Sequence, residues 1–215
     1  MLPGGFYARS TLDVARDLIG KVLVHATRAG CAAGAIVEVE AYIGEGDPAC
    51  HAAAGLTRRN APLYGPPGRA YVYLNYGIHC LVNVVTEREG APAAVLIRAL
   101  EPRKGLALMR SRRQRGRRER ERLAVIADEA LCRGPGNLTS ALAISRMQNR
   151  FDLSASRLTV EDWGERIMPI AWGPRIGIRV GADRLWRCYV PGSSCVSRSG
   201  SGRRMVLRRV DTTFR

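Results

Sequence analysis

Apolar and polar residues alternate along the segment IVEVEAYI (residues 36–43), which is the pattern of a β-strand with two different faces. The apolar face of this predicted strand carries Val37, Val39, Ala41 and Ile43. The opposite face carries Glu38, Glu40 and Tyr42. Acidic groups resist burial unless they have a partner or a function. Two carboxylates and a phenol on one face therefore indicate more than packing.

A second segment, AYVYLNYGIHCLVNVV, predicts a β-hairpin with strands at 70–75 and 79–85. The tripeptide Asn75-Tyr76-Gly77 is typical of the turn between them. We therefore expect Tyr76 to be exposed at the tip and Tyr73 to lie on a strand face. A single tyrosine in a strand is commonly a core residue with its hydroxyl at the rim, so neither position indicates a function by itself.

The remaining helices and strands are predicted from the helical period of 3.6 residues and the strand period of two. Expected helices lie at 11–19, opened by the capping box Ser10-Thr11-Leu12-Asp13, from Gly105 onward, at 123–131 and at 138–143. Further expected strands lie at 21–25, 35–43, 93–100, 157–160, 175–180 and 188–192. The strand at 21–25 is expected to form a hairpin with the strand at 35–43 across a turn at Gly30. Asn83 lies among apolar residues and needs hydrogen-bond partners or a cavity.

Residues 44–68 are a long connection without a regular pattern, which favours a functional loop. This loop contains His51, Arg58 and Arg59. Its Gly65-Pro66-Pro67-Gly68 sequence lacks the Gly-Lys-Ser/Thr ending of a phosphate-binding loop.

The chain has 215 residues, of which 46% are hydrophobic, enough for one domain with a substantial core. No internal repeat or linker is visible. We expect a single domain over residues 1–215, of mixed α/β (α+β) class, with an antiparallel sheet flanked by helices.

The net charge of +15 changes this picture, because it implies a polyanionic partner, with nucleic acid the first candidate. Only Lys21 and Lys104 are lysines among the 34 basic residues, so the excess of arginine can also reflect compositional bias. The arginine-rich run at about 110–122 is either a mobile, solvated segment or a contact to a nucleic-acid backbone. The arginine-rich tail at 198–215 is a candidate for fraying.

The sequence pattern argues against several classes of protein. The six cysteines include no Cys-x-x-Cys pair and, with the three histidines, no zinc spacing, so no metal is expected. Reduced cysteines suit a cytosolic protein. No apolar run approaches a membrane span, and the first residues lack the apolar core of a signal peptide. We expect a cytoplasmic protein without a membrane partner.

The chemistry concentrates in the first segment and in Arg98, which interrupts the apolar strand at 93–100 and should pair with a carboxylate. A carboxylate, several tyrosines and a cationic chain together suit an enzyme that handles nucleobases. Strand parity does not choose between Glu38 and Glu40 as the functional carboxylate, because both lie on the same face.

Four blocks of the sequence carry a family resemblance. They are GAIVEVEAYIGEGDPACHA, GRAYVYLNYGIHCLVNVV, VLIRALEP and CRGPGNLTSALAI, in order between Arg9 and Ser197. Together they resemble the alkyladenine (3-methyladenine) DNA glycosylase family. The resemblance implies a single mixed α/β domain around a curved antiparallel sheet. It also implies a monofunctional glycosylase that flips damaged purines out of DNA and uses no metal.

The resemblance also implies roles for particular residues. Glu40 would activate water, and Arg98 would help to hold both Glu40 and that water. Tyr42, His51 and Tyr73 would enclose the flipped base.

Two further roles come from the same source. Tyr76 would fill the gap left in the duplex. Asn83 would form the pocket floor and crowd the amino group of normal guanine. The chain departs from the family pattern at His79 and at Ser194-Cys195, and its arginine run is richer, which leaves DNA docking and substrate preference open.

The expected function is therefore that of a monofunctional DNA glycosylase without a cofactor, acting as a monomer on duplex DNA in the cytoplasm or nucleoid. Expected substrates are 3-methyladenine, 7-methylguanine, hypoxanthine and ethenoadenine. Both lysines lie outside the aromatic–acid cluster, which argues against lyase chemistry through a Schiff base. The alternative is a non-catalytic module that binds damaged DNA. A zinc deaminase is excluded because its His-x-Glu and Pro-Cys-x-x-Cys motifs are absent.

Overall fold

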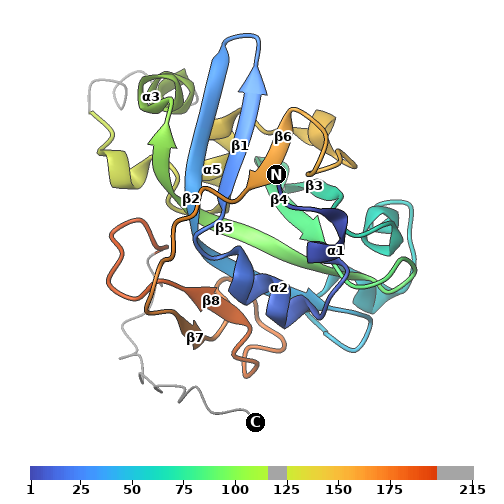
Figure 1. Cartoon of the computed structure of the whole chain (residues 1–215). Helices are drawn as coiled ribbons and strands as arrows, with labels where there is room; N and C mark the ends of the chain where they lie inside the picture. The colour runs from blue at the N-terminus through green and yellow to red at the C-terminus, as the bar shows by residue number, and fades with distance from the viewer. Residues whose placement is uncertain (116–124, 198–215) are drawn as a thin grey trace.

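The computed structural model describes residues 1–115 and 125–197, which form a single mixed α/β domain around one antiparallel sheet (Figure 1). Its strands are β1 (Val22–Thr27), β2 (Gly30–Ile43), β3 (Ala70–Asn75), β4 (His79–Val85), β5 (Ala93–Lys104), β6 (Leu158–Glu161), β7 (Ala171–Gly173) and β8 (Arg187–Tyr189). Its α-helices are α1 (Gly4–Tyr7), α2 (Thr11–Leu18), α3 (Leu106–Arg115) and α5 (Pro135–Leu142). The predicted fold class is confirmed.

The long strand β2 is the centre of the sheet, whose order is β3-β4-β5-β2-β1-β6. On one edge β2 pairs with β5 along most of its length. On the other edge it pairs first with β1 and then, over Glu38–Glu40, with β8. In Figure 1, β7 and β8 lie beside the later part of β2, far from α3. The branch at β8 therefore brings a late segment of the chain beside the acidic part of β2.

The β2–β5 ladder is irregular at its middle. Ile36 pairs with Leu100, Glu38 with Ala99, and Val39 with Ile97, so Val37 on β2 and Arg98 on β5 have no register partner. Extra residues of this kind form β-bulges, which bend a strand and re-aim side chains. The predicted alternation is consequently wrong at Val37, which packs with Ala99 and Cys195 away from the main core.

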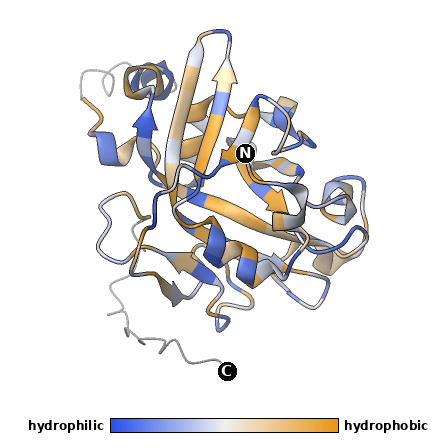
Figure 2. Cartoon of the chain, viewed as in Figure 1, coloured by the Kyte–Doolittle hydropathy of each residue, from blue (hydrophilic) through white to orange (hydrophobic). Residues whose placement is uncertain are grey.

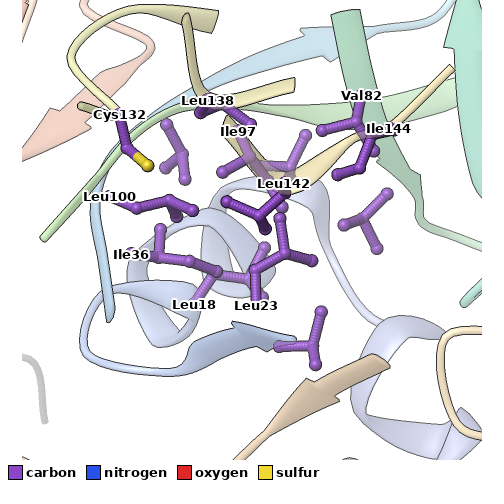
Figure 3. Close-up of a cluster of buried hydrophobic side chains, with 14 of the residues drawn as sticks. Leu18, Leu23, Ile36, Val82, Ile97, Leu100, Cys132, Leu138, Leu142 and Ile144 are labelled. Atoms are coloured by element: carbon purple, nitrogen blue, oxygen red, sulfur yellow. The ribbon is translucent and has the colours of Figure 1, made fainter. Parts of the chain in front are cut away.

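The sheet has an apolar face and a mixed face. Ile36 of β2, Val82 of β4, and Ile97 and Leu100 of β5 contribute to the main core (Figure 3). Helices α2 and α5 cover these strands, and Leu18, Leu138 and Leu142 are buried there (Figure 3). Hydropathy follows this arrangement, since the middle of the sheet is mostly hydrophobic (Figure 2). The polar and aromatic residues of strands β2 to β5 that line the cavity described below lie on the other face.

The predicted helix at 11–19 is confirmed as α2, but its expected capping box is not formed, because Ser10 makes no side-chain cap bond. Instead the carboxylate of Glu87 accepts hydrogen bonds from the Thr11 backbone N–H and hydroxyl, both at 2.7 Å. A distant acidic side chain therefore satisfies one of the orphan backbone donors of the first turn.

The two predicted hairpins, β1–β2 and β3–β4, are confirmed. The helix predicted at 123–131 is wrong for its described part, which contains only a 3₁₀ turn at Asp128–Ala130. The strand predicted at 175–180 is also wrong, because this segment is irregular and the strand lies earlier, at Ala171–Gly173. The loop at 44–68 contains two short 3₁₀ helices, His51–Ala54 and Ala61–Tyr64.

The first part of the arginine-rich run lies in α3. There Arg112 donates to the Ala141 carbonyl and Arg113 to the Ala130 carbonyl, so these two side chains hold α3 to the rest of the fold. Residues 116–122 of the run and the tail at 198–215 lie outside the described residues.

Candidate active site

A cavity of about 350 Å³ lies on the mixed face of the sheet. The strands present to it Tyr42, Tyr71, Tyr73, Leu81, Asn83, Ala94, Leu96 and Arg98. Asn75, at the end of β3, and Pro135, at the start of α5, also line it. Loops and short 3₁₀ helices complete it with Ala49, Cys50, His51, Leu63, Tyr76, Ile176, Gly177 and Ile178. Every residue that the sequence analysis assigned to the site lines this cavity except Glu40.

Glu40 lies immediately behind the cavity wall and is fully buried. Its Oε2 accepts hydrogen bonds from the Tyr42 hydroxyl at 2.9 Å and from Arg98 Nη1 at 3.1 Å. Its Oε1 accepts a hydrogen bond from the backbone N–H of Ile176 at 2.6 Å. All three donors belong to residues that line the cavity, so the carboxylate is one layer removed from the cavity and fixed by its wall.

Glu38 is the second buried carboxylate, and it faces a different set of donors. Its Oε1 accepts from Arg187 Nε at 2.6 Å and, at the longer distance of 3.4 Å, from Arg98 Nε. Its Oε2 accepts from the backbone N–H of Ser197 at 2.8 Å. Glu38 does not line the cavity, and of the two carboxylates only Glu40 bonds to Tyr42.

The two carboxylates have opposite pKa shifts. Burial raises the pKa of Glu40, and the opposing effects of Arg98, the Ile176 N–H and the Tyr42 hydroxyl do not cancel it. Burial also acts on Glu38, but Arg98, Arg187 and Ser197 outweigh it and lower its pKa. Glu40 is therefore the stronger base of the pair.

Rings from two segments form the aromatic wall of the cavity. The rings of His51 and Tyr73 meet edge to face with centroids 4.5 Å apart, and the Tyr71 ring lies 5.3 Å from the Tyr73 ring. His51 Nδ1 shares a 2.8 Å hydrogen bond with the Tyr71 hydroxyl. Burial and the charge of Arg59 lower the pKa of His51, and burial raises the pKa of Tyr73 to about 12. These rings are thus uncharged near neutral pH.

Tyr71 was not assigned to the site by sequence reasoning. It lies on the same strand as Tyr73 and two residues before it, so the alternation of β3 already places both on one face. That periodicity was the signal available to find it.

Asn83 lies in the cavity wall with its side chain fixed. Its Nδ2 donates a 3.0 Å hydrogen bond to the Tyr71 carbonyl, and the residue is 4% exposed. Asn83 therefore has both the hydrogen-bond partner and the cavity that its position among apolar residues predicted.

Tyr76 occupies the tip of the β3–β4 hairpin and is 88% exposed. Tyr76 and Gly77 both have positive φ, 48° and 71°, and the Ile78 N–H bonds to the Asn75 carbonyl at 3.0 Å. Positive φ at both central residues is typical of a type I′ turn, here within a three-residue connection, because Asn75 pairs with His79. A bulky residue with positive φ is uncommon, so an exposed tyrosine held there indicates a function.

The segment around Ile176 completes the cavity, and sequence reasoning missed it because it was predicted as a strand. The buried guanidinium of Arg175 anchors this segment by bonding to the Asp47 carboxylate at 2.5 and 2.8 Å and to the Ala41 carbonyl at 3.0 Å. It also lies 4.7 Å from the centroid of the Tyr42 ring. The chain beside Glu40 is thereby fixed to the end of β2.

Within residues 1–115 and 125–197, no three metal-binding side chains lie close enough to hold an ion. None of the helices in that part of the chain is long and apolar enough to span a membrane. Lys21 bonds to Asp162, and neither lysine lines the cavity.

A curved antiparallel sheet that carries an aromatic cavity beside a buried carboxylate–arginine pair, on a strongly basic chain, defines an enzyme that acts on nucleobases. The chain belongs to the methylpurine-DNA glycosylase family, because the sequence model of that family matches residues 5–194. The protein is a DNA glycosylase, and the resemblance found in its sequence is confirmed.

Curated relatives agree with this assignment. The chain is 48% identical over 206 residues to a protein of Methanocella arvoryzae, covering 94% of this chain and 98% of the relative. It is 45% identical to relatives from Burkholderia lata, covering 92% of this chain and 91% of the relative, and from Prosthecochloris aestuarii, covering 90% and 89%. All three carry the name "Putative 3-methyladenine DNA glycosylase".

Proposed function

We propose that this chain flips a damaged purine out of duplex DNA into the cavity and hydrolyses its N-glycosidic bond with a water activated by Glu40. The observation that carries the proposal is the buried carboxylate of Glu40, fixed by three donors directly behind an aromatic cavity. A carboxylate has about four acceptor positions, so one remains for a water. The raised pKa of Glu40 favours transfer of the water's proton to it.

Extrusion of the base costs roughly a few kcal/mol because it loses its stacking and pairing. Stacking on Tyr42, Tyr73 and His51 returns about 1–3 kcal/mol for the base. Tyr76, exposed at the tip of the β3–β4 hairpin, enters the vacated space and slows the return of the base. Extrusion and capture are thereby coupled.

Cleavage of the sugar–base bond passes through a state with positive charge on the sugar. The ionised Glu40 opposes this charge, while Arg98 holds the carboxylate in place. Alkylated purines such as 3-methyladenine and 7-methylguanine already carry positive charge and leave readily. Hypoxanthine and ethenoadenine are neutral and demand more of the site. No step requires a metal, a cofactor or a second copy of the chain.

The cleavage is proposed to stop at an abasic site. Strand cutting through a Schiff base needs an amine beside the sugar, and neither Lys21 nor Lys104 lines the cavity.

The test is incubation with duplex oligonucleotides, each carrying one of the four lesions, followed by alkali to cleave abasic sites. We expect strand cleavage only after alkali. Cleavage before alkali would contradict the monofunctional mechanism. Tight lesion binding without release of any base would instead identify a damage-binding module.

A further inference from the structure

We propose that Arg187 is a positioning residue for hydrolysis, because its pairing with Glu38 keeps the guanidinium of Arg98 on Glu40. The inference rests on the function proposed above, in which the ionised Glu40 activates water. Arg187 does not line the cavity and contacts neither Glu40 nor Tyr42 through its side chain in any hydrogen bond of the described residues. Its influence therefore passes through Glu38 and Arg98.

The four buried charges form a chain. Arg187 bonds to Glu38 at 2.6 Å, Glu38 to Arg98 at 3.4 Å, and Arg98 to Glu40 at 3.1 Å. Both carboxylates are fully buried, and Arg98 and Arg187 are 7% and 4% exposed. Arg98 can lie closer to Glu40 than to Glu38 because Glu38 already has Arg187 and the Ser197 N–H.

The strand β8 delivers Arg187 to this place. In the β2–β8 ladder the Cα of Arg187 is the register partner of Glu40. Its guanidinium lies 4.3 Å from the centroid of the Tyr189 ring. The guanidinium is thus held by packing and by strand pairing before it meets Glu38.

Loss of Arg187 would leave one guanidinium between two buried carboxylates. Like charges in one buried site cannot both stay ionised at low cost, so one carboxyl group takes up a proton. Glu40 is that group, because burial already raises its pKa, whereas the Ser197 N–H still stabilises the ionised Glu38. Arg98 then moves toward Glu38, and the base that activates water is neutralised.

The other groups that face Glu40 cannot compensate. Tyr42, on the same strand, and Tyr73, on β3, have raised pKa values and stay neutral. Arg175, from the segment that contains Ile176, is engaged with Asp47. The Ile176 N–H already donates to Glu40.

The experiment is a set of single-turnover pH–rate profiles on a hypoxanthine-containing duplex for the parent, Arg187→Gln, Glu38→Gln and the double variant. Arg187→Gln should move the acidic limb of the profile to higher pH by about 1–3 units and approach the parent rate above that limb. Glu38→Gln should move the limb to lower pH, because Arg98 then serves Glu40 alone. The double variant should have its limb at the position found for Glu38→Gln, because Arg187 acts on Glu40 only through Glu38.

A matched control is Arg103→Gln, which removes an arginine paired with Glu101 and Glu165 away from the cavity and should leave the profile in place. A rate loss by the same factor at every pH in Arg187→Gln, or a double variant no better than Arg187→Gln, would overturn the proposal. If Arg187→Gln does not fold, Arg187→Lys is measured in its place, because an ammonium does not reproduce the guanidinium contact with Glu38. An acidic limb at higher pH than in the parent supports the proposal, and an unmoved limb overturns it. Glu40→Gln separates the two claims, because activity in that variant would contradict the proposed function itself.

Discussion

Arg98 Nη1 lies 3.1 Å from Glu40 Oε2 although the β2–β5 ladder shifts its register between Glu38 and Val39, where Arg98 has no partner. Glu40 pairs with Leu96 in the regular part of the β2–β5 ladder, whereas Arg98 is the extra residue of a bulge. Arg98 nevertheless keeps the alternation of β5, because Ala94, Leu96 and Arg98 all line the cavity. Its guanidinium can then bridge Glu38 and Glu40 and still line the cavity.

Tyr76→Ala should impair base extrusion more than folding. Tyr76 is almost fully exposed, so its removal costs little core packing, and the alanine leaves the positive φ at 76 in place. A fluorescent base analogue in the duplex should report less extrusion, while the melting temperature changes by only a few degrees. A variant that unfolds would show instead that Tyr76 is a core residue.

Asn83→Ser should relax discrimination against undamaged guanine. The amide of Asn83 is held in the cavity wall by the Tyr71 carbonyl, and a shorter side chain removes a group that would meet the exocyclic amino group. The measurement is guanine release from undamaged and mismatched duplexes. A release rate equal to that of the parent would contradict the assignment of Asn83 to specificity.

Asp47→Asn should destabilise the fold by about 3–5 kcal/mol, because it leaves the buried guanidinium of Arg175 without its countercharge. Arg175 outweighs burial and lowers the pKa of Asp47, so the pair contributes stability above the ordinary aspartate pKa and loses it as the pH falls through the lowered value. Urea titrations at several pH values should show that this part of the acid dependence is missing from the variant.

The control for this prediction is Asp13→Asn on α2, which breaks an exposed pair with Arg16. It should cost at most about 1 kcal/mol. Equal losses in the two variants would show that burial does not decide the strength of the Arg175 pair.

Arg59→Gln should weaken binding to all duplexes alike and reduce the salt dependence of binding. Arg59 is exposed, and its guanidinium lies 5.8 Å from the centroid of the ring of Tyr73, which lines the cavity. There it can meet a phosphate beside the flipped base. Each phosphate contact contributes about 0.9 to the slope of log K against log salt concentration. An unchanged slope would show that Arg59 does not touch the backbone.

The local sequence pattern was sufficient to predict the elements whose two faces differ. An example is the β3–β4 hairpin, with Tyr73 on a strand face and Tyr76 at its tip. The local pattern was insufficient to predict the structure where segments distant in the sequence meet. Val37 was assigned to the wrong face because a bulge is a property of two paired strands, and one strand's sequence does not show it. Segment 175–180 has the alternation of a strand but is irregular, because Arg175 is held by Asp47 instead of by a ladder.

The alternation of side chains along the strand also did not distinguish Glu38 from Glu40, because it places both on one face. The choice of Glu40 as the functional carboxylate depended on the family resemblance. Their surroundings now distinguish them. Glu40 bonds to three residues of the cavity wall, whereas Glu38 bonds to Arg187 and Ser197 on the side away from the cavity. That difference comes from β8 and the chain after it, more than a hundred residues further along the sequence.

Glu40→Gln should abolish base release while leaving lesion binding largely intact. The amide has the size of the carboxylate and keeps an oxygen for the Ile176 N–H, but it cannot take the water's proton or oppose the charge on the sugar. Loss of a general base alone costs about 10²–10⁴-fold in rate, and lost charge stabilisation adds to this. Activity of the parent should also fall toward acid pH at a value above the ordinary glutamate pKa, because protonation of the raised Glu40 removes the base.

The matched variant for this prediction is Glu38→Gln, which removes the neighbouring carboxylate from the same strand. It should lose far less of the rate above the acidic limb, because Glu40 keeps Arg98, Tyr42 and the Ile176 N–H. Single-turnover cleavage of a hypoxanthine duplex, with lesion binding measured in parallel, compares the two. If Glu38→Gln is inactive and Glu40→Gln active, the roles are reversed. If both cleave like the parent, water is activated by neither carboxylate, and the mechanism proposed for this cavity fails.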